Sequence, residues 1–389
     1  MRYRYGVIGA GRQGVAAAFD LARFGDADEI VLADIDETAA RAAAKRINGL
    51  VGNEVASACA LDGRDRAAVT AFMRGLTACI AGVHFTFNLE TTSSAIEAGV
   101  HLCDFGGNTA VVLQQLKLDE AARAAGISVV PDCGMGPGLN VSLGVYAMSL
   151  VEVPEEVLIW DGGLPQEPEG PWNYTSTFHI DGLTNEFHGH ATFIRDGRVT
   201  PVPCFDGFEE LAFPPPIGRL EACVTAGGLS TAPWTFEGTL TRLENKTLRY
   251  PGFWTAFKAF SDLGLFEETP IRVGQQSVVP REVFHALLGP QITRPAVEDV
   301  SVMRVVCKGR TGGRRAQATI GLVDRYDPAT GFTSMQRLTG WHGSIVAIAA
   351  AAGRIRPGVV SVERCLPGAV IVEEARRRGL AITERVDLS

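Results

Sequence analysis

The first 132 residues repeat one pattern, in which a short apolar segment is followed by a segment of helical composition. "RYGVIG" at 4–9 precedes "RQGVAAAFDLARFG" at 12–25, and "EIVLAD" at 29–34 precedes an Ala- and Arg-rich segment at 37–47. Parallel strands need long crossover connections, usually helices, so this alternation predicts a doubly wound parallel sheet. Further strands are expected at 55–62, 78–83, 100–105 and 127–132, and further helices at 64–75, 88–99 and 110–125.

The first turn of this sheet carries the pattern Gly9-x-Gly11-x-x-Gly14, between a strand and a helix. An acidic residue, Asp34, ends the second strand 20 residues after Gly14. In this context Gly9 permits the tight turn, Gly11 lets a pyrophosphate approach, and Gly14 lets helix and strand pack closely. The alternative is a tight turn that binds no nucleotide. We predict a dinucleotide-binding Rossmann domain over residues 1–132.

The same turn bears on which dinucleotide is bound. The Asp34 carboxylate can accept hydrogen bonds from both ribose hydroxyls and would repel a 2′-phosphate, so NAD is expected rather than NADP. The following helix offers free N–H groups to the phosphates at its start, where Arg12 and Gln13 stand. We assign both residues to the cofactor site.

Composition excludes several classes of protein. Hydrophobic residues make up 46% and charged residues 21% of the 389, as in ordinary globular proteins. The net charge of −8 and the lack of a basic run argue against nucleic-acid binding. No apolar run is long enough to span a membrane, and no signal peptide is recognisable. The eight cysteines include no C-x-x-C pair, so we expect a cytoplasmic protein with reduced thiols and no structural metal.

The texture changes after residue 150. Strand-like segments become longer and alternate, prolines cluster at 165–171 and 213–216, and all five tryptophans lie in this part of the chain. This predicts a second α+β domain at 133–335, built on a mixed or antiparallel sheet. Residues 336–389 return to a βα-like texture, and we expect them to pack back on the first domain.

The stretch "VVPDCGMGPGLNV" at 129–141 joins the two parts. A buried strand that ends in a glycine-rich turn usually lets a ligand approach the backbone closely. Ligands of doubly wound sheets bind outside the carboxyl ends of the strands, so this turn is expected to lie near the nicotinamide. On this reasoning Gly82, Gly107 and Gly134 join the predicted cofactor site.

Several motifs resemble those of the saccharopine dehydrogenase family. They are "DFGGN", "VVPDCGMGPGLNV", "WDGGLP", "NYTSTFHIDGLTNEF", "TAGGLST", "NKTLRYPGF" and the closing "LPGAVIVEEARRRGLAI", and their order is most similar to that of the bacterial L-lysine 6-dehydrogenases. The resemblance implies a Rossmann domain, an inserted domain for substrate binding and dimerisation, and a C-terminal segment that returns to the first domain. It also implies NAD-dependent oxidation at a carbon that bears nitrogen, and a homodimer or higher homo-oligomer.

On this resemblance, the expected reaction is oxidative deamination of the terminal amine of L-lysine or a related amine, giving a semialdehyde, ammonia and NADH. One alternative is a saccharopine or carboxynorspermidine dehydrogenase, which oxidises a secondary amine. A saccharopine site would have to hold three carboxylates, whereas tryptophans could stack along a polyamine by cation–π contact. A third alternative is a protein that binds NAD and regulates a partner without turnover.

Amine oxidation needs a proton acceptor, a group that steers water and a cation for a carboxylate. Asp104, at the end of a strand, is the predicted base, with a loop-capping role as the alternative. Lys246 is expected to act on water with a lowered pKa or to bind carboxylate, and Arg249 suits bidentate carboxylate binding.

Four further residues are assigned to the substrate. Asn173 and Tyr174 can hold either end of it, although a core role is the alternative for the tyrosine. Cys133 is expected to be a small side chain packed at the turn, because hydride transfer from an amine needs no nucleophile. His342 is expected to hold a water in the cleft. "HGH" at 188–190 lacks a third ligand nearby and is interpreted as a surface feature.

Overall fold

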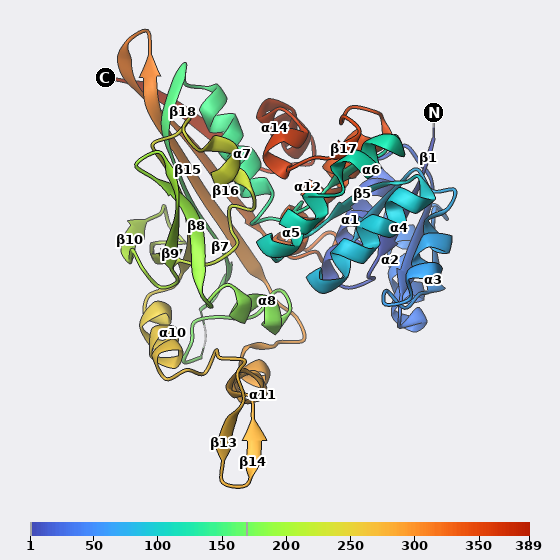
Figure 1. The fold of residues 1–389 in the computed structure, drawn as a ribbon, viewed down its shortest axis with the longest axis horizontal. Helices are drawn as coiled ribbons and strands as arrows, with labels where there is room; N and C mark the ends of the chain where they lie inside the picture. Colours follow the sequence, from blue (N-terminus) through green and yellow to red (C-terminus); the bar gives the residue numbers. More distant parts are fainter. Residues whose placement is uncertain (1, 169) are drawn as a thin grey trace.

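The computed structural model describes residues 2–168 and 170–389, and it contains two large sheets that stand side by side (Figure 1). The N-terminal sheet has seven strands in the order β17-β6-β5-β4-β1-β2-β3, and all its pairings are parallel. The predicted doubly wound sheet is therefore confirmed. Its strands are β1 (Tyr3–Ile8), β2 (Ala27–Asp34), β3 (Ala56–Ala60), β4 (Ala78–Ala81), β5 (His101–Asp104), β6 (Ser128–Val130) and β17 (Gly358–Val359).

Helices connect successive strands of this sheet. Asp36 caps α2 by accepting hydrogen bonds from the Thr38 and Ala39 N–H groups, and left-handed Gly52 ends that helix. The single helix expected at 110–125 is two helices, because the chain between them tightens to i→i−3 hydrogen bonds. The helices are α1 (Arg12–Phe24), α2 (Glu37–Val51), α3 (Arg66–Met73), α4 (Asn88–Ala98), α5 (Thr109–Leu116) and α6 (Asp119–Ala124).

The C-terminal segment returns to this sheet, as predicted. Helix α12 (Ser334–Ala351) starts at a Thr333 capping box and packs against α1, β4 and β5. A Cβ on Gly340 would lie 2.7 Å from the Ala17 backbone nitrogen, so α12 approaches α1 too closely for any side chain there. Strand β17 then pairs with β6 at the edge of the sheet.

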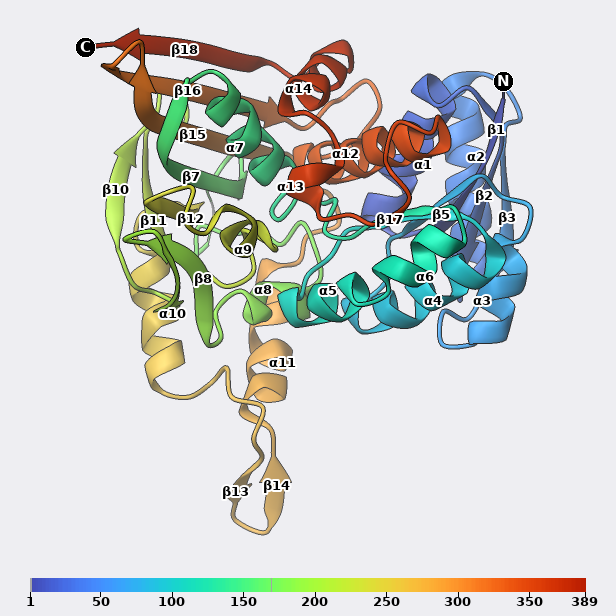
Figure 2. The ribbon, with the colours of Figure 1, turned by 45° about the horizontal axis from the view of Figure 1, so that its top comes forward.

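The second sheet is mixed. Its main path is β10-β11-β12-β7-β15-β16-β18, in which β12 and β7 are parallel and the other neighbours antiparallel. Strands β8 and β9 extend from β12, and the small hairpin β13–β14 projects from the body beside α11 (Pro280–Ile292) (Figure 2). The strands are β7 (Val153–Pro165), β8 (His190–Arg195), β9 (Arg198–Pro203), β10 (Glu209–Ala212), β11 (Arg219–Val224), β12 (Arg242–Arg249), β13 (Ile271–Val273), β14 (Gln276–Val278), β15 (Asp299–Thr311), β16 (Arg314–Arg325) and β18 (Ile382–Leu388).

The last strand departs from the course expected for 336–389. Strand β18 pairs with β16 of the second sheet, so the C-terminal segment contributes to both domains. Its pairing with β16 satisfies backbone groups that an open edge would leave exposed. The remaining helices are α7 (Leu139–Ser149), α8 (Ile180–Asn185), α9 (Ala232–Phe236), α10 (Phe253–Asp262), α11 (Pro280–Ile292), α13 (Val362–Cys365) and α14 (Gly368–Arg377).

Candidate active site

The turn between β1 and α1 has the geometry of a phosphate-binding loop. A Cβ on Gly9 would lie 2.4 Å from the Gly82 carbonyl oxygen, and one on Gly14 would lie 1.9 Å from the Gly9 oxygen. A Cβ on Gly11, in contrast, would meet no atom within 4 Å. Gly9 and Gly14 therefore close the turn, while Gly11 leaves open space in front of the helix N-terminus, where a pyrophosphate would bind.

Asp34 lies beside this turn. One carboxylate oxygen accepts the Ala10 N–H at 2.7 Å and the other accepts the Asp36 N–H at 3.0 Å. Each oxygen keeps a lone pair for a ribose hydroxyl. Arg12 is exposed, and its guanidinium donates to the Ser176 carbonyl of the second domain at 3.4 Å.

A cavity of about 290 Å³ lies where the two domains meet. The turn 134–138 forms part of its wall and is closed by the Leu139 N–H, which donates to the Gly134 oxygen. Gly138 has a φ of 136°, and a Cβ there would lie 2.2 Å from the same oxygen. Only glycine fits this position, which explains the glycine-rich stretch between β6 and α7. Of the predicted cofactor residues, Gln13, Gly82, Gly107 and Gly134 line the cavity.

Strand β12 supplies the opposite wall. Asn245, Thr247 and Arg249 line the cavity, whereas Lys246 does not. Side chains alternate along a strand, so residues 246 and 249 cannot share a face. The Lys246 ammonium pairs instead with Glu209 at 2.7 Å, and Trp160 donates to the same carboxylate.

Asp161 on β7, which was absent from the predicted set, faces the cavity. Its two oxygens accept hydrogen bonds from the side-chain amides of Asn140, at 3.0 Å, and Asn245, at 2.8 Å. A Cβ on Gly136 would lie 2.6 Å from Asp161 Oδ2, so the carboxylate rests directly against the glycine turn. Burial raises the pKa of Asp161 to about 6, and the two amides and Arg249 oppose the rise.

Glu186 and Arg249 form an ion pair in the same wall, with 3.6 Å between Arg249 Nη2 and Glu186 Oε2. The guanidinium also lies 5.1 Å from the centre of the Tyr174 ring and donates to the Leu248 carbonyl. Burial raises the pKa of Glu186 to about 7, although the Arg249 charge opposes the rise. The arrangement fixes a cation between a carboxylate and an aromatic ring.

Asp104 lies beneath the cavity rather than in its wall. It is fully buried and accepts hydrogen bonds from the Gly106 and Asp132 N–H groups and from the Gln115 side-chain amide. Burial raises its pKa. Asp104 thus ties together the turns that follow β5 and β6, and it stands in the position of the loop cap that was its alternative role.

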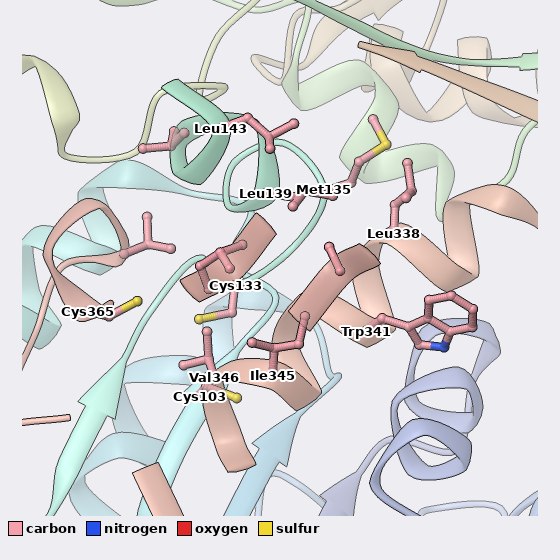
Figure 3. Packing of buried hydrophobic residues seen from close by; sticks show 14 of the residues in the cluster. Cys103, Cys133, Met135, Leu139, Leu143, Leu338, Trp341, Ile345, Val346 and Cys365 are labelled. Atoms are coloured by element: carbon pink, nitrogen blue, oxygen red, sulfur yellow. The ribbon is translucent and has the colours of Figure 1, made fainter. Parts of the chain in front are cut away.

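Cys133 and His342 are also buried away from the cavity. Figure 3 shows Cys133 within a packed cluster that includes Cys103, Ile345 and Val346. Burial raises the pKa of the Cys133 thiol, in keeping with the expected packing role. His342 Nε2 lies 3.1 Å from Ser142 Oγ, and burial lowers the pKa of the ring to about 4, so the imidazole is neutral at pH 7.

Tyr174 belongs to an aromatic cluster and reaches the site only through the Arg249 guanidinium that lies over its ring. Asn173 and Tyr174 do not line the cavity, and neither does any of the five tryptophans.

In the described chain, 2–168 and 170–389, no three His, Cys, Asp or Glu side chains gather as a metal site requires. No helix of that part is long and apolar enough to cross a membrane.

Sequence reasoning thus missed Asp161, Glu186 and Asn245. All three stand in motifs that carried the family resemblance: "WDGGLP", "GLTNEF" and "NKTLRY". Strand alternation could have indicated Asn245. Asn245, Thr247 and Arg249 are spaced by two along one strand, so they share the face on which Arg249 was predicted to bind substrate.

A glycine turn shaped for phosphate, and a cavity between it and a second domain, define a dinucleotide-binding protein with a small-molecule site. The saccharopine dehydrogenase NADP binding domain matches residues 5–130, and the saccharopine dehydrogenase C-terminal domain matches residues 134–380. The chain belongs to the saccharopine dehydrogenase family. Its first domain is an NAD(P)-binding domain.

Individual relatives agree with this assignment. A saccharopine dehydrogenase [NADP(+), L-glutamate-forming] of Pyricularia oryzae is 28% identical over 226 residues, which cover 54% of this chain and 48% of the relative. The match therefore spans about half the length of that relative. Among solved structures, the L-Glu-forming saccharopine dehydrogenase of Saccharomyces cerevisiae aligns over 99% of this chain and 100% of its own, with a TM-score of 0.78 and 18% identity. Homospermidine synthase of Legionella pneumophila, in complex with NAD, aligns over 100% of this chain and 92% of its own, with a TM-score of 0.65 and 11% identity. These two structures share the fold. The finer resemblance to L-lysine 6-dehydrogenases stays a prediction.

Proposed function

We propose that this protein is an NAD(P)-dependent oxidoreductase that oxidises a carbon–nitrogen bond of an amine substrate. The observation that carries the proposal is the position of Asp161, whose carboxylate faces the cavity and rests against the glycine turn that follows β6. The family supports the same chemistry, because the relative matched in sequence is a saccharopine dehydrogenase.

The residues of the cavity suit amine oxidation. A dinucleotide held by the glycine turn would supply the acceptor for a hydride from the carbon that bears the nitrogen. Asp161 takes the proton that leaves the nitrogen, so that a C=N double bond forms. Water then adds to the carbon, the C–N bond breaks, and an amine or ammonia leaves. A carboxylate with a pKa near 6 is mostly ionised at pH 7 and close enough to it to exchange protons.

Two substrates remain in competition within this class. The names of the relatives favour a secondary amine such as saccharopine, whereas the charge of the cavity favours the terminal amine of L-lysine or a similar molecule. We propose NAD as the preferred cofactor, because Asp34 lies beside the glycine turn with acceptor capacity for the ribose hydroxyls.

The test is a screen for NADH and NADPH formation with saccharopine, L-lysine, L-ornithine and carboxynorspermidine, followed by product analysis. Amine-dependent reduction of the cofactor is expected. Release of glutamate from saccharopine would indicate the secondary-amine reaction, and release of ammonia from lysine would indicate deamination. Cofactor binding without reduction by any amine would refute the proposal in favour of a non-catalytic NAD-binding protein.

A further inference from the structure

The charges that line the cavity are unevenly divided. Among the described residues of its wall, Arg249 is the single lysine or arginine, and Asp161 and Glu186 are the two carboxylic acids. With both acids ionised, which for Glu186 requires a pH above about 7, and with His84 and His179 counted as neutral, the described residues of the wall carry a net charge of −1. A substrate of opposite charge would therefore bind with fewer unpaired groups.

Arg249 is partly engaged within the protein and keeps donor capacity for one carboxylate. Nη1 donates to the Leu248 carbonyl at 2.9 Å, Nη2 lies 3.6 Å from Glu186, and the guanidinium lies over the Tyr174 ring. Among the described residues, Nε is buried without a hydrogen-bond partner, and Nη2 meets Glu186 only at ion-pair distance. Such a guanidinium can receive one carboxylate, and the part of the wall that the structure describes holds no second lysine or arginine.

A neighbouring hollow of about 190 Å³ does not change this balance. It shares Gly107, Asn185 and 226–228 with the main cavity, so a long substrate would extend into it. Histidine, threonine and asparagine side chains line it, but its described residues include no lysine, arginine, aspartate or glutamate. Extra carboxylates of a longer substrate would find no fixed positive charge there.

We infer that the substrate is a cationic amine with at most one carboxylate, whose ammonium groups face Asp161 and Glu186 and whose carboxylate, where present, meets Arg249. This rests on the proposed function and names the substrate class of the same site. The inference excludes saccharopine as the substrate. Saccharopine carries three carboxylates, and at least two of them would have no cation to pair with in this site. The geometry favours a molecule such as L-lysine or a polyamine.

Binding without turnover tests the inference. The protein loaded with NADH, which cannot accept a hydride, is titrated calorimetrically with L-lysine, cadaverine, spermidine and saccharopine. We expect saccharopine to bind at least about tenfold more weakly than the best of the other three, since an unpaired buried charge costs more than about 1.4 kcal/mol. Saccharopine binding as tightly as that ligand, or failure of all three amines to bind, would overturn the inference.

Two variants test the named contacts. Glu186→Gln should weaken binding of the amines about ten- to a hundredfold and leave NADH affinity unchanged, because it removes one charge at constant shape. Glu298→Gln, at an exposed position outside the cavity, is the matched control and should change neither. Arg249→Met should weaken L-lysine more than cadaverine, which differs from lysine only by the carboxylate. Equal effects on the two ligands, or undiminished amine affinity in Glu186→Gln, would contradict the assignment.

The outcomes also separate this inference from the proposed function. Amines that bind the NADH complex but never reduce NAD or NADP would refute the oxidoreductase function and leave the ligand class intact. Efficient oxidation of saccharopine would support the oxidoreductase function and refute the ligand class.

Discussion

Replacing Asp161 by asparagine should remove the proton acceptor while keeping the side-chain shape. A positioned general base typically contributes about 10²- to 10⁴-fold to the rate, so the plateau of kcat should fall by that amount. Because the pKa of Asp161 is raised to about 6, about 90% of this carboxyl is ionised at pH 7 and about 10% at pH 5. The wild-type rate should therefore rise about tenfold between pH 5 and its plateau.

The assay is initial-rate NAD(P)H formation between pH 5 and 9 for the wild type and Asp161→Asn. Glu186, with a pKa of about 7, titrates in the same range. The fall of the rate at acidic pH therefore reports the titration of Asp161 and Glu186 together. The variants separate the two, because Asp161→Asn should lower kcat whereas Glu186→Gln should mainly raise KM. A near-normal plateau for Asp161→Asn would refute the reasoning and place the base elsewhere.

The fold of the variant has to be checked first. Asp161 accepts from two amide groups, and an asparagine offers one oxygen to the same two donors. One amide would be left facing another, at a cost of about 1–3 kcal/mol in stability. Thermal unfolding and NADH titration should show a folded protein with normal cofactor affinity, and Glu298→Gln is the control in both measurements.

Three further substitutions test the placement of residues predicted from the sequence. Lys246→Ala should leave kcat and KM nearly unchanged in steady-state assays, because the ammonium pairs with Glu209 outside the cavity; a large fall in kcat would contradict the structure. Asp104→Ala should lower the free energy of unfolding by about 3 kcal/mol or more in denaturant titrations, because it strands the buried N–H group of Asp132 and the half-buried N–H group of Gly106; an unchanged midpoint would show that the hydrogen bonds contribute nothing. Asp34→Ala should reduce the ratio of kcat/KM for NAD to that for NADP, and an unchanged ratio would refute the role of its charge.

Local sequence determined the first domain almost completely. The alternation of strands and helices, the contact of Gly14 with Gly9 and the cap of α2 depend on neighbours within a few residues along the chain. These preferences are readable without a structure because steric fit and hydrogen bonding act at short range. The family motifs likewise indicated which segments surround the site, and every missed residue stands inside one of them.

Which side chain of each motif enters the cavity was decided by tertiary structure. Spacing alone excluded a shared face for Lys246 and Arg249, but only the packing of β12 beside β7 decided which of them turns inward. Asp104 and Asp161 both stand in strands, and the chain around each gives no sign that one is sealed beneath the turns while the other faces the cavity. That difference arises from Gln115, Asn140 and Asn245, which come from other elements. Burial and charge depend on such distant contacts, so the sequence predicts the segments of the site, and the folded chain decides which carboxylate faces the cavity.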